Sequence, residues 1–498
     1  MARVGRQPSL KRRHRFVSSV ATSVIVQGSW EVLLVASTDG LVNGGIAGLF
    51  WTYVWTSVGM ALMVLSLAEM ASMAPTSSGP YHWVSELAPS KHRRFLSQVT
   101  GWTSTVAWQA GAATGPFVVG TMFRSLVEIN YGWNGWTTWQ DTLLVWCTVL
   151  VIAGANCYNG SLPPLLQVLI MTLYVSGFLA TTVLLLAFAP RLPASALLTA
   201  FTNDGGWPDM KTSLLVGQIS AVYACVGSDA IVHMGEETKN AARTIPRSMV
   251  CSYLLSGVMG LSFLISYLLC ITDVPGALHD PSGYPFLFVL NSAFSPETVN
   301  AIAAIVLTLV LAGTLSHNAA SSRQIWAFAR DGGLPFSRWI SKVHSGLQVP
   351  INAICLTAAT TVLFSLINLG SKIAFKAILS LNLVCLLWTY MVCVGCILYQ
   401  RVYHPDSLPR SRWTLGKWGF AINIGSLAHT FFVFFWSFWP NVTPAGWEDL
   451  NCAALMFPTA LAVTYIDWWS RAKGEYQAPA ERLEGRRGAG TLVSASSV

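Results

Sequence analysis

Charge is scarce in this chain of 498 residues, of which Asp, Glu, Lys and Arg together make up 10%. A typical soluble domain carries about 25% charged residues, so the composition excludes a set of water-soluble domains. Hydrophobic residues make up 53% of the chain and fill most of its length in uncharged runs. These runs also exclude disorder outside the chain ends, because disordered segments are poor in apolar residues.

Motifs of enzymes and metal sites are missing as well. The ten cysteines lie in apolar stretches without metal-ligand spacing, so we interpret them as core residues rather than a disulfide framework. No GxSxG, P-loop or HExxH pattern is present, and we therefore expect no enzyme activity, no cofactor and no metal. No small-residue cleavage site follows the first apolar run, so we expect no removable signal peptide.

Long apolar runs bounded by charged residues are what the sequence contains instead. A helix needs about 20 mostly apolar residues to cross a bilayer. We predict an all-α polytopic membrane protein with twelve transmembrane helices, at residues 16–38, 44–72, 96–123, 142–158, 163–189, 213–235, 247–272, 297–322, 349–370, 375–399, 418–438 and 449–467. Residues 1–15 form a basic tail in this interpretation, and residues 471–498 form a disordered tail.

The basic residues indicate which side of the membrane each loop faces. The chain has 30 Lys and Arg residues and a net charge of +8. If the N-terminus is cytoplasmic, 25 of the 30 fall on cytoplasmic segments, which is the distribution of a correctly oriented membrane protein. We therefore expect both termini in the cytoplasm, in the plasma membrane, with lipid rather than nucleic acid as the partner of the positive charge.

Two acidic residues stand out within predicted membrane helices, where an uncompensated charge is costly. Glu31 lies in the first span, in the sequence Gln-Gly-Ser-Trp-Glu, and Asp229 lies in the sixth, in Val-Gly-Ser-Asp. Interrupted helices at matching places of two repeats indicate a substrate site at the membrane midplane. A plainer interpretation remains open, in which the Gly-Ser pairs allow close packing and Asp229 pairs with His233 one turn later.

Three stretches of the chain, residues 66–84, 227–238 and 322–337, resemble the amino acid/polyamine/organocation superfamily of transporters. Within it they are most similar to the fungal amino-acid and choline permease group, and the similarity runs from about residue 16 to 470. The resemblance implies an inverted repeat of five plus five helices over residues 16–400, two further helices over residues 401–470, and alternating access. The sequence departs from the group where Ser78-Gly79 replaces a glycine pair, and where a single glycine precedes Trp30 and Glu31.

The residues around the two breaks suggest what the site binds. The positive end of a half-helix favours an anion, but an ionised Glu31 beside it favours a cation. Trp30 and Tyr223 could add cation–π contacts, although each could equally be a packing residue. The predicted substrate-binding residues are Gly28, Ser29, Trp30, Glu31, Tyr223, Gly227, Ser228 and Asp229. We predict a secondary transporter that imports choline, a polyamine or γ-aminobutyrate, with a broad amino-acid permease as the alternative and a membrane enzyme as a distant one.

Charged residues after the sixth span provide candidates for gating and coupling. These candidates are His233, Glu236, Glu237 and Arg243. Charged pairs at the inner mouth of a cavity can hold one state closed, but a solvated loop with topogenic charge explains the same residues. Arg323 and Arg330 allow the same two interpretations. The resemblance favours a co-transported proton, whereas the membrane potential alone could draw a cation inward.

Overall fold

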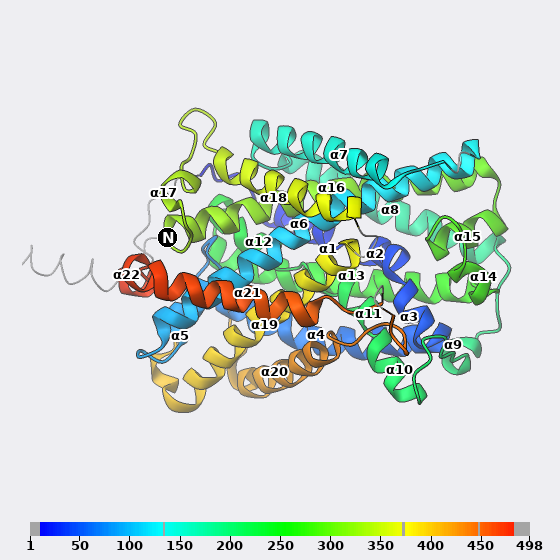
Figure 1. Cartoon of the computed structure of the whole chain (residues 1–498). Coiled ribbons are helices and arrows are strands. Elements are labelled where there is room, and N and C mark those ends of the chain that lie inside the picture. Colours follow the sequence, from blue (N-terminus) through cyan, green and yellow to red (C-terminus); the bar gives the residue numbers. More distant parts are fainter. Residues whose placement is uncertain (1–9, 133–134, 371–373, 447–448, 483–498) are drawn as a thin grey trace, which may run out of the picture.

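The computed structural model describes residues 10–132, 135–370, 374–446 and 449–482 of the chain. These residues form helices joined by loops (Figure 1), and no β-strand occurs within the described ranges. One isolated bridge pairs His14 with Thr238. The predicted all-α architecture is confirmed.

The first half of the chain holds helices at the first five predicted spans. Its helices are α1 (Phe16–Gln27), α2 (Ser29–Ala36), α3 (Thr38–Val42), α4 (Gly45–Met73), α5 (Pro80–Leu87), α6 (Arg93–Tyr131), α7 (Thr138–Asn159), α8 (Pro164–Phe188) and α9 (Ala196–Thr199). The first span is divided into α1 and α2. The second to fifth spans correspond to α4, α6, α7 and α8.

The second half begins with the other divided span. Its helices are α10 (Met210–Gly217), α11 (Ile219–Tyr223), α12 (Ala230–His233), η2 (Gly235–Glu237), α13 (Ala241–Cys270), α14 (Val274–Leu278), α15 (Pro285–Ala293), α16 (Pro296–Arg330), α17 (Ser337–Ile340), α18 (Ile351–Gly370), α19 (Ala374–Tyr403), η3 (Pro405–Ser407), η4 (Gly416–Trp418), α20 (Gly419–Trp436), α21 (Ala453–Asp467), the π-helical η5 (Trp468–Ala472) and α22 (Lys473–Glu475). The sixth span thus consists of α10 to α12, and α13, α16, α18, α19, α20 and α21 follow as the seventh to twelfth.

Eight helical segments of the described ranges are long and apolar enough to cross a membrane, which confirms a multi-pass membrane protein. They are Phe16–Ala36, Gly45–Met73, Thr138–Asn159, Pro164–Phe188, Ala241–Cys270, Pro296–Arg330, Phe375–Tyr403 and Gly416–Trp436. Helix α6 has 39 residues but is not among them. It packs against α16 and α19 inside the bundle, where a helix can carry polar side chains because they face protein or a cavity instead of lipid.

Both predicted interruptions are confirmed. Helix α1 ends at Gly28, which has the left-handed φ of 49° that glycine adopts without strain. Residues 224–229 separate α11 from α12. The Ser29 hydroxyl donates a hydrogen bond to the carbonyl oxygen of Ala224 at 2.9 Å, so the two breaks lie against each other.

The N-terminal segment lies against the chain that follows the sixth span. The backbone N–H groups of Arg13 and His14 donate to the carbonyl oxygen of Glu237, and the N–H of Lys239 donates to that of His14. Both Leu10 and His14 are buried. The described part of the predicted basic tail is therefore packed against the end of the bundle that is predicted to be cytoplasmic, here called the inner end, near α5, α17 and α22 (Figure 1).

The C-terminal segment differs from the expected disordered tail. Residues 471–482 pack against the same end of the bundle, and residues 483–498 lie outside the described part of the chain. Tyr476 is fully buried, its hydroxyl lies 2.7 Å from the Ser97 hydroxyl, and its carbonyl oxygen accepts a hydrogen bond from Arg94. Burial of this aromatic side chain supplies the apolar contact that the Gly- and Ser-rich composition did not suggest.

Candidate functional site

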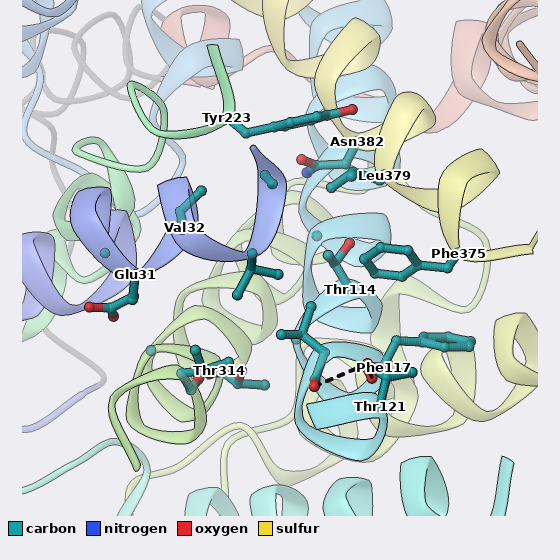
Figure 2. Close-up of a pocket in the computed structure, with 18 of the residues that line it drawn as sticks. Glu31, Val32, Thr114, Phe117, Thr121, Tyr223, Thr314, Phe375, Leu379 and Asn382 are labelled. Atoms are coloured by element: carbon teal, nitrogen blue, oxygen red, sulfur yellow. Dashed lines mark hydrogen bonds between the residues drawn. The ribbon is translucent and has the colours of Figure 1, made fainter. Parts of the chain in front are cut away.

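A cavity of about 730 Å³ lies between the broken helices and α6, α16 and α19. It extends from the two breaks to residues 282–284 and to Arg124, at the end of the bundle opposite the chain termini. In Figure 2, Glu31 lies on one side of the cavity, while Phe375 and Asn382 of α19 lie on the other. The cavity therefore reaches the break region from the predicted outer side.

Glu31 lies in the first turn of α2, at the positive end of this half-helix. Its side chain lines the cavity but is only 2% exposed as a residue. It folds back over the break, because a Cβ atom added to Gly28 would lie 2.7 Å from Glu31 Oε1. Within the described part of the chain, Oε2 has no hydrogen-bond partner. The carboxylate thus covers the backbone of the break and keeps one oxygen available.

Asp229 also lines the cavity and is buried. Its carboxyl group hydrogen-bonds to the side chain of Tyr390 on α19. The alternative pairing with His233 is not formed, since Nδ1 of His233 lies 3.0 Å from the carbonyl oxygen of Ser77 instead. Both intramembrane acids therefore belong to one cavity and are contributed by the two different breaks.

The structure divides the other predicted binding residues into two groups. Gly28, Tyr223 and Gly227 line the cavity, but Ser29, Trp30 and Ser228 do not. The Trp30 ring is fully buried and packs against Phe263, with ring centroids 5.1 Å apart. Phe263 belongs to α13, so Trp30 lies on the side of α2 that packs against α13. Trp30 is thus a packing residue in this structure rather than a cation–π partner.

The cavity lining also includes residues that are not among the predicted binding residues. Examples are Trp108 of α6, His317 of α16 and Asn382 of α19. The Trp108 ring lies between two histidines, with its centroid 4.7 Å from that of His233 and 4.8 Å from that of His317. His317 could have been found from the sequence, because an ionisable residue within a membrane span is a functional candidate.

Below the cavity, two ion pairs connect the segment that follows α12 to helix α16. Arg323 Nε donates to Glu237 Oε1 at 2.8 Å, with side-chain exposures of 1% and 6%. Arg330 donates to both oxygens of Glu236, at 3.0 and 2.7 Å. The predicted gating glutamates therefore pair with α16. Arg243 lies outside these two pairs and is exposed.

The N-terminal segment adds to this closure. His14 lies under Glu237 and Arg323, and its burial lowers the pKa of the imidazole below the usual 6.5. Glu237 thus contacts α16 through its side chain and residues 13–14 through its carbonyl oxygen. The inner end of the bundle is closed by side chains and backbone together.

Comparison with known proteins gives one family and many relatives. The family model described as amino acid permease matches residues 17–461. A protein of Macrophomina phaseolina, provisionally named an amino acid/polyamine transporter, is 28% identical over 436 residues, which cover 87% of this chain and 96% of that protein. The choline transporter of Saccharomyces cerevisiae is 26% identical over 455 residues, covering 90% and 80%. Amino-acid permease 2 of Neurospora crassa is 26% identical over 488 residues, covering 96% and 88%.

Proposed function

Because the chain belongs to the amino acid permease family, whose members are transporters and not enzymes, we propose that it imports a small amine-bearing solute by alternating access. The solutes that we consider are choline, a polyamine and γ-aminobutyrate. The observation that carries the proposal is that Glu31 and Asp229, one from each helix break, line a single buried cavity. The proposed site comprises the lining residues Gly28, Glu31, Tyr223, Gly227 and Asp229, with Ser29, Trp30 and Ser228 supporting the breaks.

The position of Glu31 favours an amine over a carboxylate. Its side chain already covers the positive end of α2, where a substrate carboxylate would otherwise bind. A second carboxylate would also meet the negative charge of Glu31. A cation gains from the same charge, and in a site shielded from water this attraction is stronger than in bulk solvent.

Charges at the mouth of the cavity do not oppose this selection. Arg124 lies there, but it pairs with Asp141 at 2.9 Å and with Glu128 at 3.2 Å. Its charge is thereby balanced by two acids. Lys376 also lines the cavity and is exposed to solvent, which screens it.

A broad amino-acid permease is the second candidate. It is supported by relatives such as amino-acid permease 2 of N. crassa. The choline transporter of S. cerevisiae supports the first candidate in the same way. Import of neutral α-amino acids would require their carboxylate to displace or share the contacts of Glu31 at the break.

The arrangement also supports a mechanism. We infer an outward-facing state, because the cavity extends away from the inner ion pairs. Opening toward the cytoplasm then requires separating Glu236 from Arg330 and Glu237 from Arg323. We propose the plasma membrane as the location, with both termini cytoplasmic, on the basis of the basic residues. A proton is the proposed co-substrate, with Glu31, Asp229 and His233 as the candidate carriers.

Uptake of labelled solutes tests the proposal. Cells expressing the chain should import at least one of choline, putrescine and γ-aminobutyrate. Glu31→Gln should lower the uptake of cations more than that of neutral amino acids at equal surface expression. Glu297→Gln, which changes an exposed glutamate at the start of α16, serves as the matched control. Equal losses for cationic and neutral solutes would assign Glu31 to folding or coupling instead.

A further inference from the structure

We propose that His317 recognises the substrate: its Nε2 atom accepts a hydrogen bond from an N–H group of the bound amine. The site would then select amines that retain an N–H group over fully methylated ones. This inference rests on the proposed function and narrows its substrate class. His317 lies on α16 three residues after Thr314 and lines the same cavity as Glu31 (Figure 2 labels Thr314 and Glu31).

The hydrogen bonds of the imidazole determine which nitrogen can accept. His317 hydrogen-bonds to the backbone of Trp108. The free acceptor of this backbone is the carbonyl oxygen, which also accepts from the Ser321 hydroxyl at 2.8 Å. A carbonyl oxygen only accepts, so one ring nitrogen of His317 must be the donor. Nε2 has no partner among the described residues, which assigns the donor role to Nδ1.

Nε2 therefore carries the free lone pair of a neutral imidazole. Among the described residues the ring forms no ion pair with a carboxylate, so a second proton on it would be an uncompensated charge in a site shielded from water. A buried acceptor without a partner costs free energy, about 1–3 kcal/mol for such a group in proteins. A ligand that supplies a donor removes this cost, and one without a donor does not.

Packing holds the acceptor at the cavity wall. The Trp108 ring lies 4.8 Å from the imidazole and restrains its tilt. Across from it is Gly111 of α6, which also lines the cavity. A Cβ atom added to Gly111 would lie 2.6 Å from Nε2 of His317 and 2.6 Å from Nδ2 of Asn382. Nε2 of His317 therefore faces Gly111 and the amide of Asn382, at a place where a glycine fits and a larger residue would force a shift.

Glu31 and His317 would make different demands on a ligand. The carboxylate of Glu31 attracts any cation, whether it is a primary ammonium or a trimethylammonium group. The lone pair of His317 is satisfied only by a donor, which a trimethylammonium group lacks. A site with both residues therefore uses charge for attraction and the N–H group for discrimination.

The test compares solutes that differ only in methylation of nitrogen. The probes are γ-aminobutyrate with its N-trimethyl analogue, and putrescine with its fully methylated analogue. We expect the wild-type protein to prefer the member with N–H groups in each pair. His317→Phe keeps an aromatic ring but no acceptor, and should reduce this preference by about tenfold. His317→Gln, whose side-chain oxygen reaches about as far as Nε2, should retain most of it.

A second variant tests the same acceptor without changing the histidine. Gly111→Ala should reduce the preference because His317 or Asn382 must move away. Gly154→Ala is the matched control, since a Cβ atom there meets nothing within 4 Å. Unchanged preference in both His317→Phe and Gly111→Ala, at normal surface expression, overturns the inference, as does an equal loss for both members of each pair. If the wild-type protein imports choline but none of the four probes, the inference is overturned while the proposed function stands. If it imports neither choline nor any of the four probes, the proposed function fails as well.

Discussion

The pair of Glu237 and Arg323 offers the sharpest test of the inner closure. Nε of Arg323 lies 2.8 Å from Oε1 of Glu237, and both side chains are almost completely buried. Removing one partner of such a pair leaves an uncompensated buried charge, which costs about 3–5 kcal/mol. In the proposed mechanism this cost falls on the inside-closed state alone, because opening exposes Arg323 to water. A cost of about 3 kcal/mol already shifts the equilibrium toward the inside-open state by about 100-fold.

Thiol labelling can measure this shift. Ala320 is fully buried beside Trp108 and lies one turn before Arg323. A cysteine introduced there should react slowly with a permeant maleimide in the parent protein, and much faster after Glu237→Gln, with mass spectrometry reading this site alone. Glu475→Gln is the control, because its pair with Arg471 is 67% exposed on the glutamate side and should contribute little.

A double variant tests whether the effect of Glu237→Gln comes from the unpaired charge of Arg323 rather than from the loss of Glu237 itself. Glu237→Gln combined with Arg323→Gln removes both charges, so no buried charge is left without a partner. Its labelling rate should lie closer to that of the parent than the rate of Glu237→Gln alone. Labelling that stays slow in Glu237→Gln would refute the role of this pair in holding the inner end closed.

Three further predictions concern single residues. Gly28→Ala should destabilise the protein by about 1–2 kcal/mol and reduce uptake, because alanine is strained at this φ and its Cβ atom would meet Glu31. The melting temperature should fall further than it does for Gly154→Ala. Burial lowers the pKa of His14, so docking of the N-terminal segment is stable above pH 6.5 and weakens as the pH falls from there toward the lowered pKa. Hydrogen exchange at the His14 amide, corrected for intrinsic rates, should then become faster. Tyr476→Phe should lower stability by about 1 kcal/mol through loss of its hydroxyl contact with Ser97, and an unchanged melting temperature would contradict this.

The sequence predicted the fold well because charge marks where membrane helices end. The predicted span 163–189 corresponds to α8, Pro164–Phe188. Helix α16 continues past the predicted end of the eighth span at residue 322 and reaches Arg330. Arg323 and Arg330 do not end this helix because each finds a glutamate partner from another segment. A single sequence shows the charges but not these partners.

The candidate site was predictable only in part. Glycine followed by a small polar residue and an acid indicated the breaks, since few other reasons explain such residues in an apolar span. Which neighbour faces the cavity depends on the rotation of α2, and this separated Glu31 from Trp30. The sequence could have indicated His317 as a candidate, but its proposed role depends on the backbone of Trp108 and on Gly111, which only the packing of α6 against α16 shows.

Asp229 and His317 at the cavity lie close along the chain to the residues of the inner ion pairs. Asp229 and Glu236 flank α12, a helix of four residues. His317 and Arg323 lie on α16, about 9 Å apart along its axis. A ligand shifts an equilibrium between two states only by its difference in affinity for them. A ligand that draws α12 and α16 together or apart at the cavity must also change the distances within the ion pairs, because these short stretches cannot absorb the movement. We therefore expect binding and inner closure to be coupled through α12 and α16 themselves, without a longer chain of intervening contacts.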